Sequence, residues 1–358
     1  MTSSIFEGLS RPVTQVAGPR SRPMAILLNA NAKRVTPTFI ESMQRRFPKE
    51  DVFVTQDLKQ AFEICQTVLD RGYEILAVGG GDGTATHAMN HLLRAQRGAE
   101  TLPKLAILRL GTGNALGCLT GAGEVREDLF HWNEGGEATE RLSLIRDDDG
   151  FLFPFASVGY DARVLNDYEE LLGRAKQPLA RFVMRSAGGY GVAALMRTIP
   201  TELSARPVRF KVKAVGPSSF LDPETDEEQP LESDAVLFEG IARAVSLGTT
   251  PFYGYGLRAL PFALRRRDRF QVRVTTAPPA RLLRQFGALW RGTLRSPEIR
   301  DFLVEGVHIE TDQPQPVQMA GEAAGYRTCF GANLSDQAFE LLRGSRKPLA
   351  VIAHRARI

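Results

Sequence analysis

The chain has 358 residues, of which 43% are hydrophobic and 24% are charged, and its formal net charge is +4. This ordinary globular composition excludes collagen-like, coiled-coil and fully disordered proteins. Because Arg181, Arg185 and Arg197 interrupt the most apolar region, no run of 18 apolar residues exists, and the sequence predicts no transmembrane helix.

Residues 1–22 are rich in Pro, Ser and Arg and contain no continuous apolar segment, so we expect a flexible tail without a secretion signal. The three cysteines, Cys65, Cys118 and Cys329, are widely spaced and form no CxxC pair. A disulfide framework is therefore not expected, and a reducing compartment is the simplest location. The sequence predicts a cytoplasmic protein.

From Met24 onward, short apolar segments alternate with amphipathic ones. Apolar residues such as Leu58, Phe62, Cys65 and Leu69 recur at the spacing of one helix face. Strands are expected at 25–29, 52–55, 75–80 and 105–110, with helices at 37–47, at 58–69 and from Thr84. Such a βαβ series predicts an α/β domain whose parallel sheet is covered by helices on both faces.

After about residue 143 the apolar residues change to strict alternation. VRFKVKAV at 208–215 and RFQVRV at 269–274 alternate apolar with polar side chains, which is typical of half-buried antiparallel strands. Helical stretches near 162–175 and 180–198 interrupt this region early. We therefore predict three parts after the tail: an α/β domain over 23–142, a mostly antiparallel β-sandwich over 143–340, and an extension over 341–358 that packs back on the first domain.

A glycine-rich loop, GGGDGT, follows the third expected strand and precedes a helix. Its glycines, Gly79, Gly80, Gly81 and Gly83, let the backbone approach a bulky anion with its N–H groups. Asp82 would repel a phosphate unless its carboxylate contacts a cation or a hydroxyl group. Its presence therefore indicates a catalytic role or contact with a metal ion. The alternative is a tight turn with a purely structural role.

A second loop, RLGTGNALG, follows the next strand and contains Gly111, Thr112, Gly113 and Asn114. Two such loops at adjacent strand ends would form one crevice, which is where open α/β sheets bind ligands. Neither loop is a GxxxxGK[ST] phosphate loop. Neither fits GxGxxG, because the third glycine, Gly117, comes one residue too late.

GGGDGT followed by GTGN resembles the diacylglycerol kinase catalytic domain family, which includes bacterial lipid kinases, sphingosine kinases and ceramide kinases. Further matches occur in the family's order, from about residue 24 to 335: LLNANAKRV, VFVT, SVGYDARV, FYGYGLRALPFA and MAGE. GGDGT alone is shared with NAD kinases and phosphofructokinases, whereas the combination is specific.

The resemblance implies the NAD-kinase and diacylglycerol-kinase type of fold, with ATP between an α/β domain and a C-terminal β-sandwich that receives the lipid. It implies that Asp82 and Asp161 serve the catalytic network, that Glu322 is the base that deprotonates the lipid hydroxyl, and that Asp268 lies in the metal-site segment. It assigns these residues to nucleotide binding: Asn29, Thr55, Gly79, Gly80, Gly81, Gly83, Thr84, Gly111, Thr112, Gly113 and Asn114. The implied cofactors are ATP and Mg²⁺.

Three positions depart from the family pattern. Ala115 stands where many members have the Asp of GTxND, and Ala320 replaces the Asp of DGE. Arg269 replaces a glycine beside Asp268, and an Asp among arginines forms an ion pair more easily than it binds a metal. The leading hypothesis is an ATP- and Mg²⁺-dependent kinase of diacylglycerol or of a sphingoid or ceramide-like lipid.

Two other hypotheses stay open: a catalytically weak lipid-binding or regulatory homologue, and a kinase of a soluble substrate of the NAD-kinase type. His87 and His91 have the i, i+4 spacing of a zinc pair, but no further ligand accompanies them, so a zinc site is not expected. No nucleic-acid module is recognisable either. The sequence does not indicate an oligomeric state.

Residues 240–300 are strongly basic, with 12 arginines against only Asp268 and Glu298. Within them, RLLRQFGALWRGTLR at 281–295 places its apolar residues on one face of a helix, among them Phe286, Trp290 and Leu294. Such a helix suits the surface of an anionic membrane, so reversible peripheral attachment is expected. The alternative is a helix packed on the sandwich with its arginines in water.

Overall fold

The structure is a computed structural model that describes residues 24–98, 101–136, 138–160, 162 and 207–348. The predicted tail, the helical stretches expected near 162–175 and 180–198, and Asp161 lie outside the described residues.

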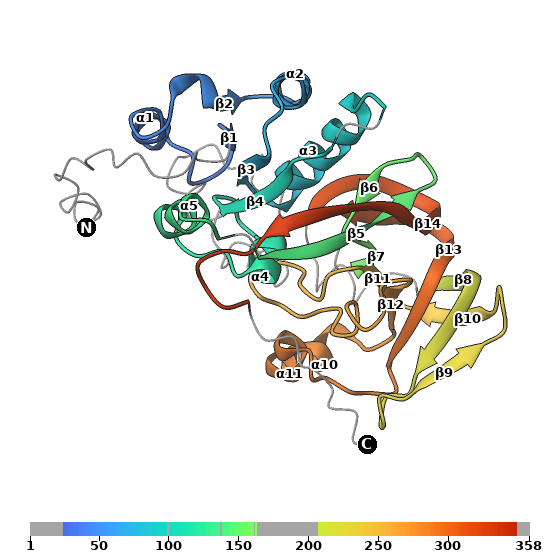
Figure 1. The fold of residues 1–358 in the computed structure, drawn as a ribbon. Coiled ribbons are helices and arrows are strands. Elements are labelled where there is room, and N and C mark those ends of the chain that lie inside the picture. Colours follow the sequence, from blue (N-terminus) through green and yellow to red (C-terminus); the bar gives the residue numbers. More distant parts are fainter. Residues whose placement is uncertain (1–23, 99–100, 137, 161, 163–206, 349–358) are drawn as a thin grey trace, which may run out of the picture.

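The first half is an α/β layer structure with parallel strands, as predicted (Figure 1). The strands are β1 (Met24–Asn29), β2 (Val52–Thr55), β3 (Ile75–Gly80) and β4 (Lys104–Arg109), in the spatial order β4-β3-β1-β2. The helices are α1 (Pro37–Gln44), the 3₁₀ turn Lys49–Asp51, α2 (Leu58–Asp70), α3 (Asp82–Ala95), α4 (Ala115–Thr120) and α5 (Val125–Asn133).

Helices bury both faces of this parallel sheet. On one face, α2 and α3 contribute Cys65 and Met89 to a core with the strand residue Leu76. On the other face, Met43 of α1 and Trp132 of α5 belong to a second core cluster. A sheet with helices on both faces needs strands that are apolar along their whole length. Every residue of β3 is buried, as this requires.

The second half consists mostly of antiparallel strands, which confirms the predicted change of pattern. Its strands are β5 (Thr139–Asp147), β6 (Leu152–Phe153), β7 (Phe155–Gly159), β8 (Val208–Leu221), β9 (Glu228–Leu231), β10 (Val236–Ala242), β11 (Ala244–Gly248), β12 (Phe270–Thr275), β13 (Ile299–Met319) and β14 (Glu322–Leu342). Phe210, Val212 and Ala214 of β8 are buried and the basic residues between them are exposed, as the alternation predicts.

One strand joins the two halves. At its end, β14 pairs in parallel with β4, Leu341 opposite Leu105 and Leu342 opposite Ala106, so the sheet runs without interruption from β2 to β12. Strand β5 crosses the boundary expected near residue 142. The start of β14, which carries Glu322, is therefore placed relative to the first half by the same strand that ends on β4.

Asp128 reinforces this junction. Its carboxylate is fully buried and accepts hydrogen bonds from the Gly123 N–H at 2.8 Å and from both the N–H and the hydroxyl of Ser345 at 2.7 Å. Gly123 lies between α4 and α5, whereas Ser345 follows β14. One side chain therefore fixes the chain that returns from the second half.

The single amphipathic helix predicted over 281–295 is wrong in its length. Two short helices, α10 (Pro279–Arg284) and α11 (Phe286–Arg291), replace it, because the chain turns at Gln285 and ends α11 on Gly292 with φ 70°. Leu294 is buried, whereas Phe286 and Trp290 are exposed. Neither helix, nor any other in the described residues, is long and apolar enough to cross a membrane.

Replacing Asp128 by Ala removes the acceptor of the buried Gly123 N–H and of the N–H and hydroxyl of Ser345, an exposed residue. Because an unsatisfied buried group costs about 1–3 kcal/mol, we expect Asp128→Ala to lower the free energy of unfolding by about 2 kcal/mol. Urea unfolding measures this loss. Asp149→Ala, which changes an exposed carboxylate, is the control. A loss below about 1 kcal/mol at Asp128 would show that the junction does not depend on this carboxylate.

Candidate active site

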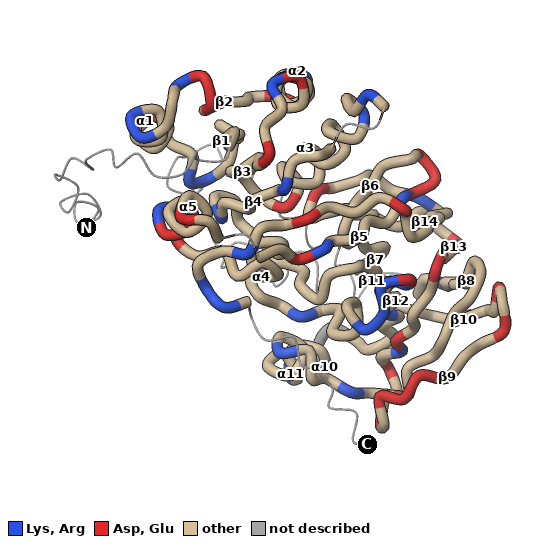
Figure 2. The backbone as a smooth tube through the Cα atoms, in the orientation of Figure 1, with Lys and Arg blue, Asp and Glu red and all other residues tan. Residues whose placement is uncertain are grey.

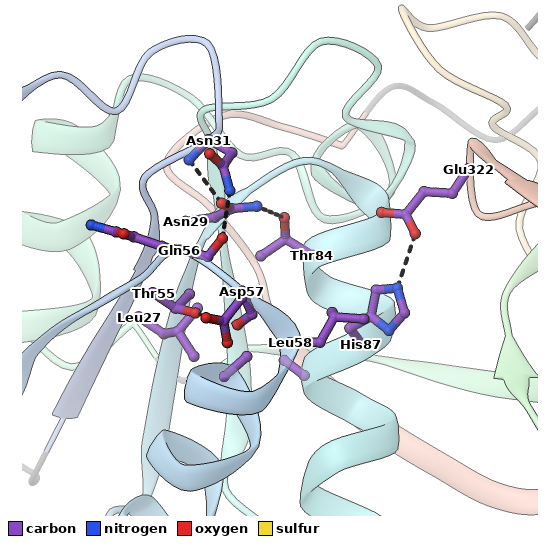
Figure 3. A pocket seen from close by; sticks show the side chains of 12 residues that line it. Leu27, Asn29, Asn31, Thr55, Gln56, Asp57, Leu58, Thr84, His87 and Glu322 are labelled. Carbon is purple, nitrogen blue, oxygen red and sulfur yellow. Dashed lines mark hydrogen bonds and ion pairs between the residues drawn. The ribbon is translucent and has the colours of Figure 1, made fainter. Parts of the chain in front are cut away.

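A pocket of about 280 Å³ opens beside the carboxyl ends of β1 and β2 and the first turns of α3 (Figure 3). It is lined by Leu27, Asn29, Asn31, Thr55, Gln56, Asp57, Leu58, Ala61, Thr84, His87, Ala88 and Glu322. Four of these, Asn29, Thr55, Thr84 and Glu322, are predicted site residues. Ligands of open α/β sheets bind at the carboxyl ends of the strands, so this pocket is the candidate active site.

Asn29 and Thr84 connect the first strand to the glycine-rich loop. The Asn29 side-chain amide donates to the Thr84 hydroxyl at 2.9 Å. A Cβ on Gly80 would lie only 2.4 Å from that hydroxyl oxygen, so this close turn requires glycine. Thr55 is buried at the end of β2 and donates its hydroxyl to the Asp57 carbonyl at 2.7 Å, which shapes the entry to α2.

Asp82 begins α3, and its side chain links the first glycine loop to the helix that follows the second. Its side chain is buried, and its two oxygens accept the N–H groups of Ala115 at 2.8 Å and Leu116 at 2.9 Å, which begin α4. Burial raises the pKa of the Asp82 carboxyl, and these N–H donors and the nearby Arg109 oppose the rise. Asp82 thus couples the two helix starts, and a direct part in catalysis stays a prediction.

The two glycine loops touch through their backbones. A Cβ on Gly111 would lie 2.2 Å from the Gly81 Cα, a distance that no real side chain tolerates. The contact is asymmetric, because a Cβ on Gly81 would have the Gly111 Cα at 3.8 Å as its nearest neighbour. The glycine at 111 therefore sets the distance between the loops.

Asn114 shapes the second loop. Its backbone adopts the left-handed conformation, φ 54°, which Asn tolerates better than most residues, and its amide donates to the Gly111 carbonyl at 2.9 Å. Its buried side-chain oxygen has no partner among the described residues. The second half also holds this loop, since the Tyr255 N–H donates to the Gly113 carbonyl at 2.7 Å.

Glu322 reaches the pocket from the turn between β13 and β14. The two turn residues, Ala320 and Gly321, have φ values of 50° and 80°, as a type I′ hairpin requires. A Cβ on Gly83 would lie 1.9 Å from the Glu322 Oε1 atom, so the carboxylate packs directly on the first turn of α3. The positive end of that helix dipole favours a negative charge there.

His87 is a pocket residue that the sequence did not assign to this site. Its Nε2 lies 2.9 Å from the Glu322 Oε2, a contact between residues 235 positions apart (Figure 3). A local signal exists, because His87 is three residues after Thr84 and shares its helix face. The i, i+4 spacing of His87 and His91 is instead typical of a zinc-binding pair. Within the described residues, no group of three His, Cys, Asp or Glu side chains is placed to hold a metal.

Asp268 does not line the pocket, and its contacts do not fit a metal ligand. Arg266 donates to both of its oxygens, at 3.0 and 2.9 Å, and this hydrogen-bonded pair lowers the pKa of the Asp268 carboxyl. Arg269, which replaces the family's glycine, lies 3.7 Å from Glu228 in the same ionic network. Arg266 thus occupies both oxygens that a cation would need.

Comparison with known proteins agrees with this fold. Residues 24–139 match the family model of the diacylglycerol kinase catalytic domain, which supports a kinase. A diacylglycerol kinase of Bacillus anthracis str. Sterne is 15% identical with a TM-score of 0.58, over 91% of this chain and 98% of that one. A second Sterne structure, classed provisionally as a diacylglycerol kinase, is 17% identical with a TM-score of 0.61, over 90% and 97%. At these identities the likeness establishes the fold. No curated protein matches the sequence.

The asymmetric glycine contact predicts unequal effects of alanine on stability. Gly111→Ala forces the loops apart, and overpacking of this kind costs about 1–3 kcal/mol. Gly81→Ala meets only an ordinary contact and should change the free energy of unfolding by less than about 0.5 kcal/mol. Urea unfolding of both variants without ligand compares them. Equal losses would show that the backbones do not meet as described.

Proposed function

Residues 24–139 belong to the diacylglycerol kinase catalytic domain family, and from this premise we propose that the protein is an ATP-dependent kinase of a lipid hydroxyl group. The observation that carries the proposal is the position of Glu322. Its carboxylate comes from the second half of the chain and lies against Gly83, in the glycine-rich start of α3. A carboxylate that could accept a proton thus lines the same pocket as Thr84, the last residue of the glycine-rich loop.

The residues of the pocket suit a nucleotide. Backbone N–H groups of the loop from Gly80 to Thr84 and of the loop from Gly111 to Asn114 would hold the phosphates, and the start of α3 adds its dipole. Leu58 and Ala61 give the pocket an apolar wall against which the adenine ring could pack. Bound ATP supplies the phosphoryl group, and Asp82 keeps the two loops in register through Ala115 and Leu116.

Glu322 would accept the proton of the lipid hydroxyl while that oxygen forms a bond to the γ-phosphorus. The bond between this phosphorus and the β,γ-bridging oxygen breaks, and ADP leaves. Phosphoryl transfer depends on positioning and on compensation of charge, which the loop N–H groups provide. Mg²⁺ enters this proposal only as the counter-ion of ATP, because Asp268 is engaged by Arg266.

The pair α10 and α11 supports a membrane-bound substrate. Phe286 and Trp290 are 46% and 36% exposed, and their ring centroids lie 5.3 Å apart. Arg284 and Arg291, from the same two helices, form no ion pair with any described residue. Exposed aromatic rings beside unpaired arginines suit an anionic bilayer, and Figure 2 shows basic residues on these helices.

Not every arginine of this region is available to a membrane. Arg295 is bound to Asp226 at 2.8 Å and lies over the Phe262 ring at 4.8 Å. Arg281 pairs with Glu298 at 2.6 Å. The proposed docking surface consists of Phe286, Trp290, Arg284 and Arg291, and it would hold the enzyme reversibly at a membrane facing the cytoplasm.

Lipid-dependent formation of ADP tests the proposed function, with micelles of diacylglycerol, sphingosine or ceramide and with NAD as a soluble acceptor. Glu322→Gln should lower kcat about 100-fold or more and leave the ATP KM within about threefold, because a base acts mainly in the transition state. Glu305→Gln, at an exposed position of β13, is the matched control. A raised ATP KM with normal kcat would reassign Glu322 to nucleotide binding, and turnover with NAD alone would exclude a lipid acceptor.

The docking surface predicts salt-sensitive binding to vesicles that contain an anionic lipid. Arg284→Glu with Arg291→Glu should reduce co-sedimentation at low salt, since each engaged arginine contributes about 1 kcal/mol, and high salt should weaken binding of the unmodified protein. Arg45→Glu with Arg46→Glu changes the net charge equally on the first half and should have little effect. If both pairs of substitutions weaken vesicle binding equally, the attraction depends on the net charge of the protein and not on this surface.

A further inference from the structure

His87 is held rigidly at the rim of the pocket. Its ring stacks on His91, with centroids 6.1 Å apart and planes at 28°, and contacts Phe151 at 5.5 Å. The Nε2 atom points at Glu322 Oε2 over 2.9 Å. The His87 side chain is only 22% exposed, whereas that of Glu322 is 51% exposed. The less exposed side chain of the pair can therefore restrict the position of the more exposed one.

The two oxygens of Glu322 have different surroundings. Oε2 contacts His87, while Oε1 lies over Gly83 at the start of α3. A free glutamate side chain on a surface turn samples many rotamers, and general-base catalysis requires the oxygen within hydrogen-bond reach of its proton. A fixed partner on one oxygen leaves the other in a defined place.

From this geometry we propose that His87 is a positioning residue for Glu322. The inference rests on the proposed function, in which Glu322 is the base. Neutral His87, protonated at Nε2, donates to Oε2 and leaves Oε1 to accept the proton of the substrate hydroxyl.

Titratable groups from several elements lie near His87. Glu322 is the carboxylate in contact with it, and Asp57 lines the same pocket. On α3 itself, burial lowers the pKa of His91, and His87 and Arg94 lower it further, so His91 contributes a neutral ring. From α2, burial raises the pKa of the Cys65 thiol to about 12, so this thiol is uncharged as well.

The test compares His87→Ala, which removes the donor, with His87→Gln, whose side-chain amide can donate without titrating. His87→Ala should lower kcat about tenfold with the ATP KM nearly unchanged, because a small displacement of a reacting group is costly. His87→Gln should restore most of kcat, because its amide can still donate to the Glu322 carboxylate. His308→Gln, on the remote strand β13, is the control, and thermal melts verify each fold.

A second readout does not depend on turnover. The chain has five histidines, and their ring signals can be observed by NMR. Glu322→Gln should shift the His87 ring signals, because it changes the group that lies 2.9 Å from Nε2, and leave those of His308 in place. Unchanged His87 signals, or a His87→Ala variant as active as the unmodified enzyme, would overturn the inference. Full activity of Glu322→Gln would instead overturn the proposed function, whatever the NMR shows.

Discussion

The backbone contact between Gly81 and Gly111 is the constraint on which the site depends. Parallel strands β3 and β4 lie side by side, so the loops that follow them meet at one edge of the sheet. Two loops can approach this closely only where no Cβ stands between them. Asp82 then fixes the position of one loop relative to the other, because its buried carboxylate accepts hydrogen bonds from the first two N–H groups of α4.

The second half of the chain completes the pocket through one long strand. β14 begins at Glu322, over α3, and ends in parallel pairing with β4, so the position of the carboxylate follows from the sheet and not from a free loop. The tight turn before it requires positive φ at Ala320, a conformation that costs an alanine about 1–2 kcal/mol. The departure from the family at this position therefore strains the turn without removing it.

Much of this arrangement could be predicted because its causes are local in the sequence. Apolar periodicity showed the strands and helices of the first half, and glycine density showed both loops. The break at Gln285 and the burial of Leu294 depend on how 281–295 packs, which periodicity alone does not determine. The pairing of His87 with Glu322 joins residues from distant parts of the chain, and only the sheet topology brings them together.

The two carboxylates of the site are suited to different tasks by their surroundings. Both oxygens of Asp82 are bound by backbone N–H groups inside the protein, so a proton taken up there would weaken the link between the loops. Glu322 is half exposed, with one oxygen on His87 and the other over Gly83, and no loop backbone depends on its charge for a hydrogen bond among the described residues. These surroundings are compatible with the proposed role of Glu322 as the base, whereas the contacts of Asp82 hold the two loops together.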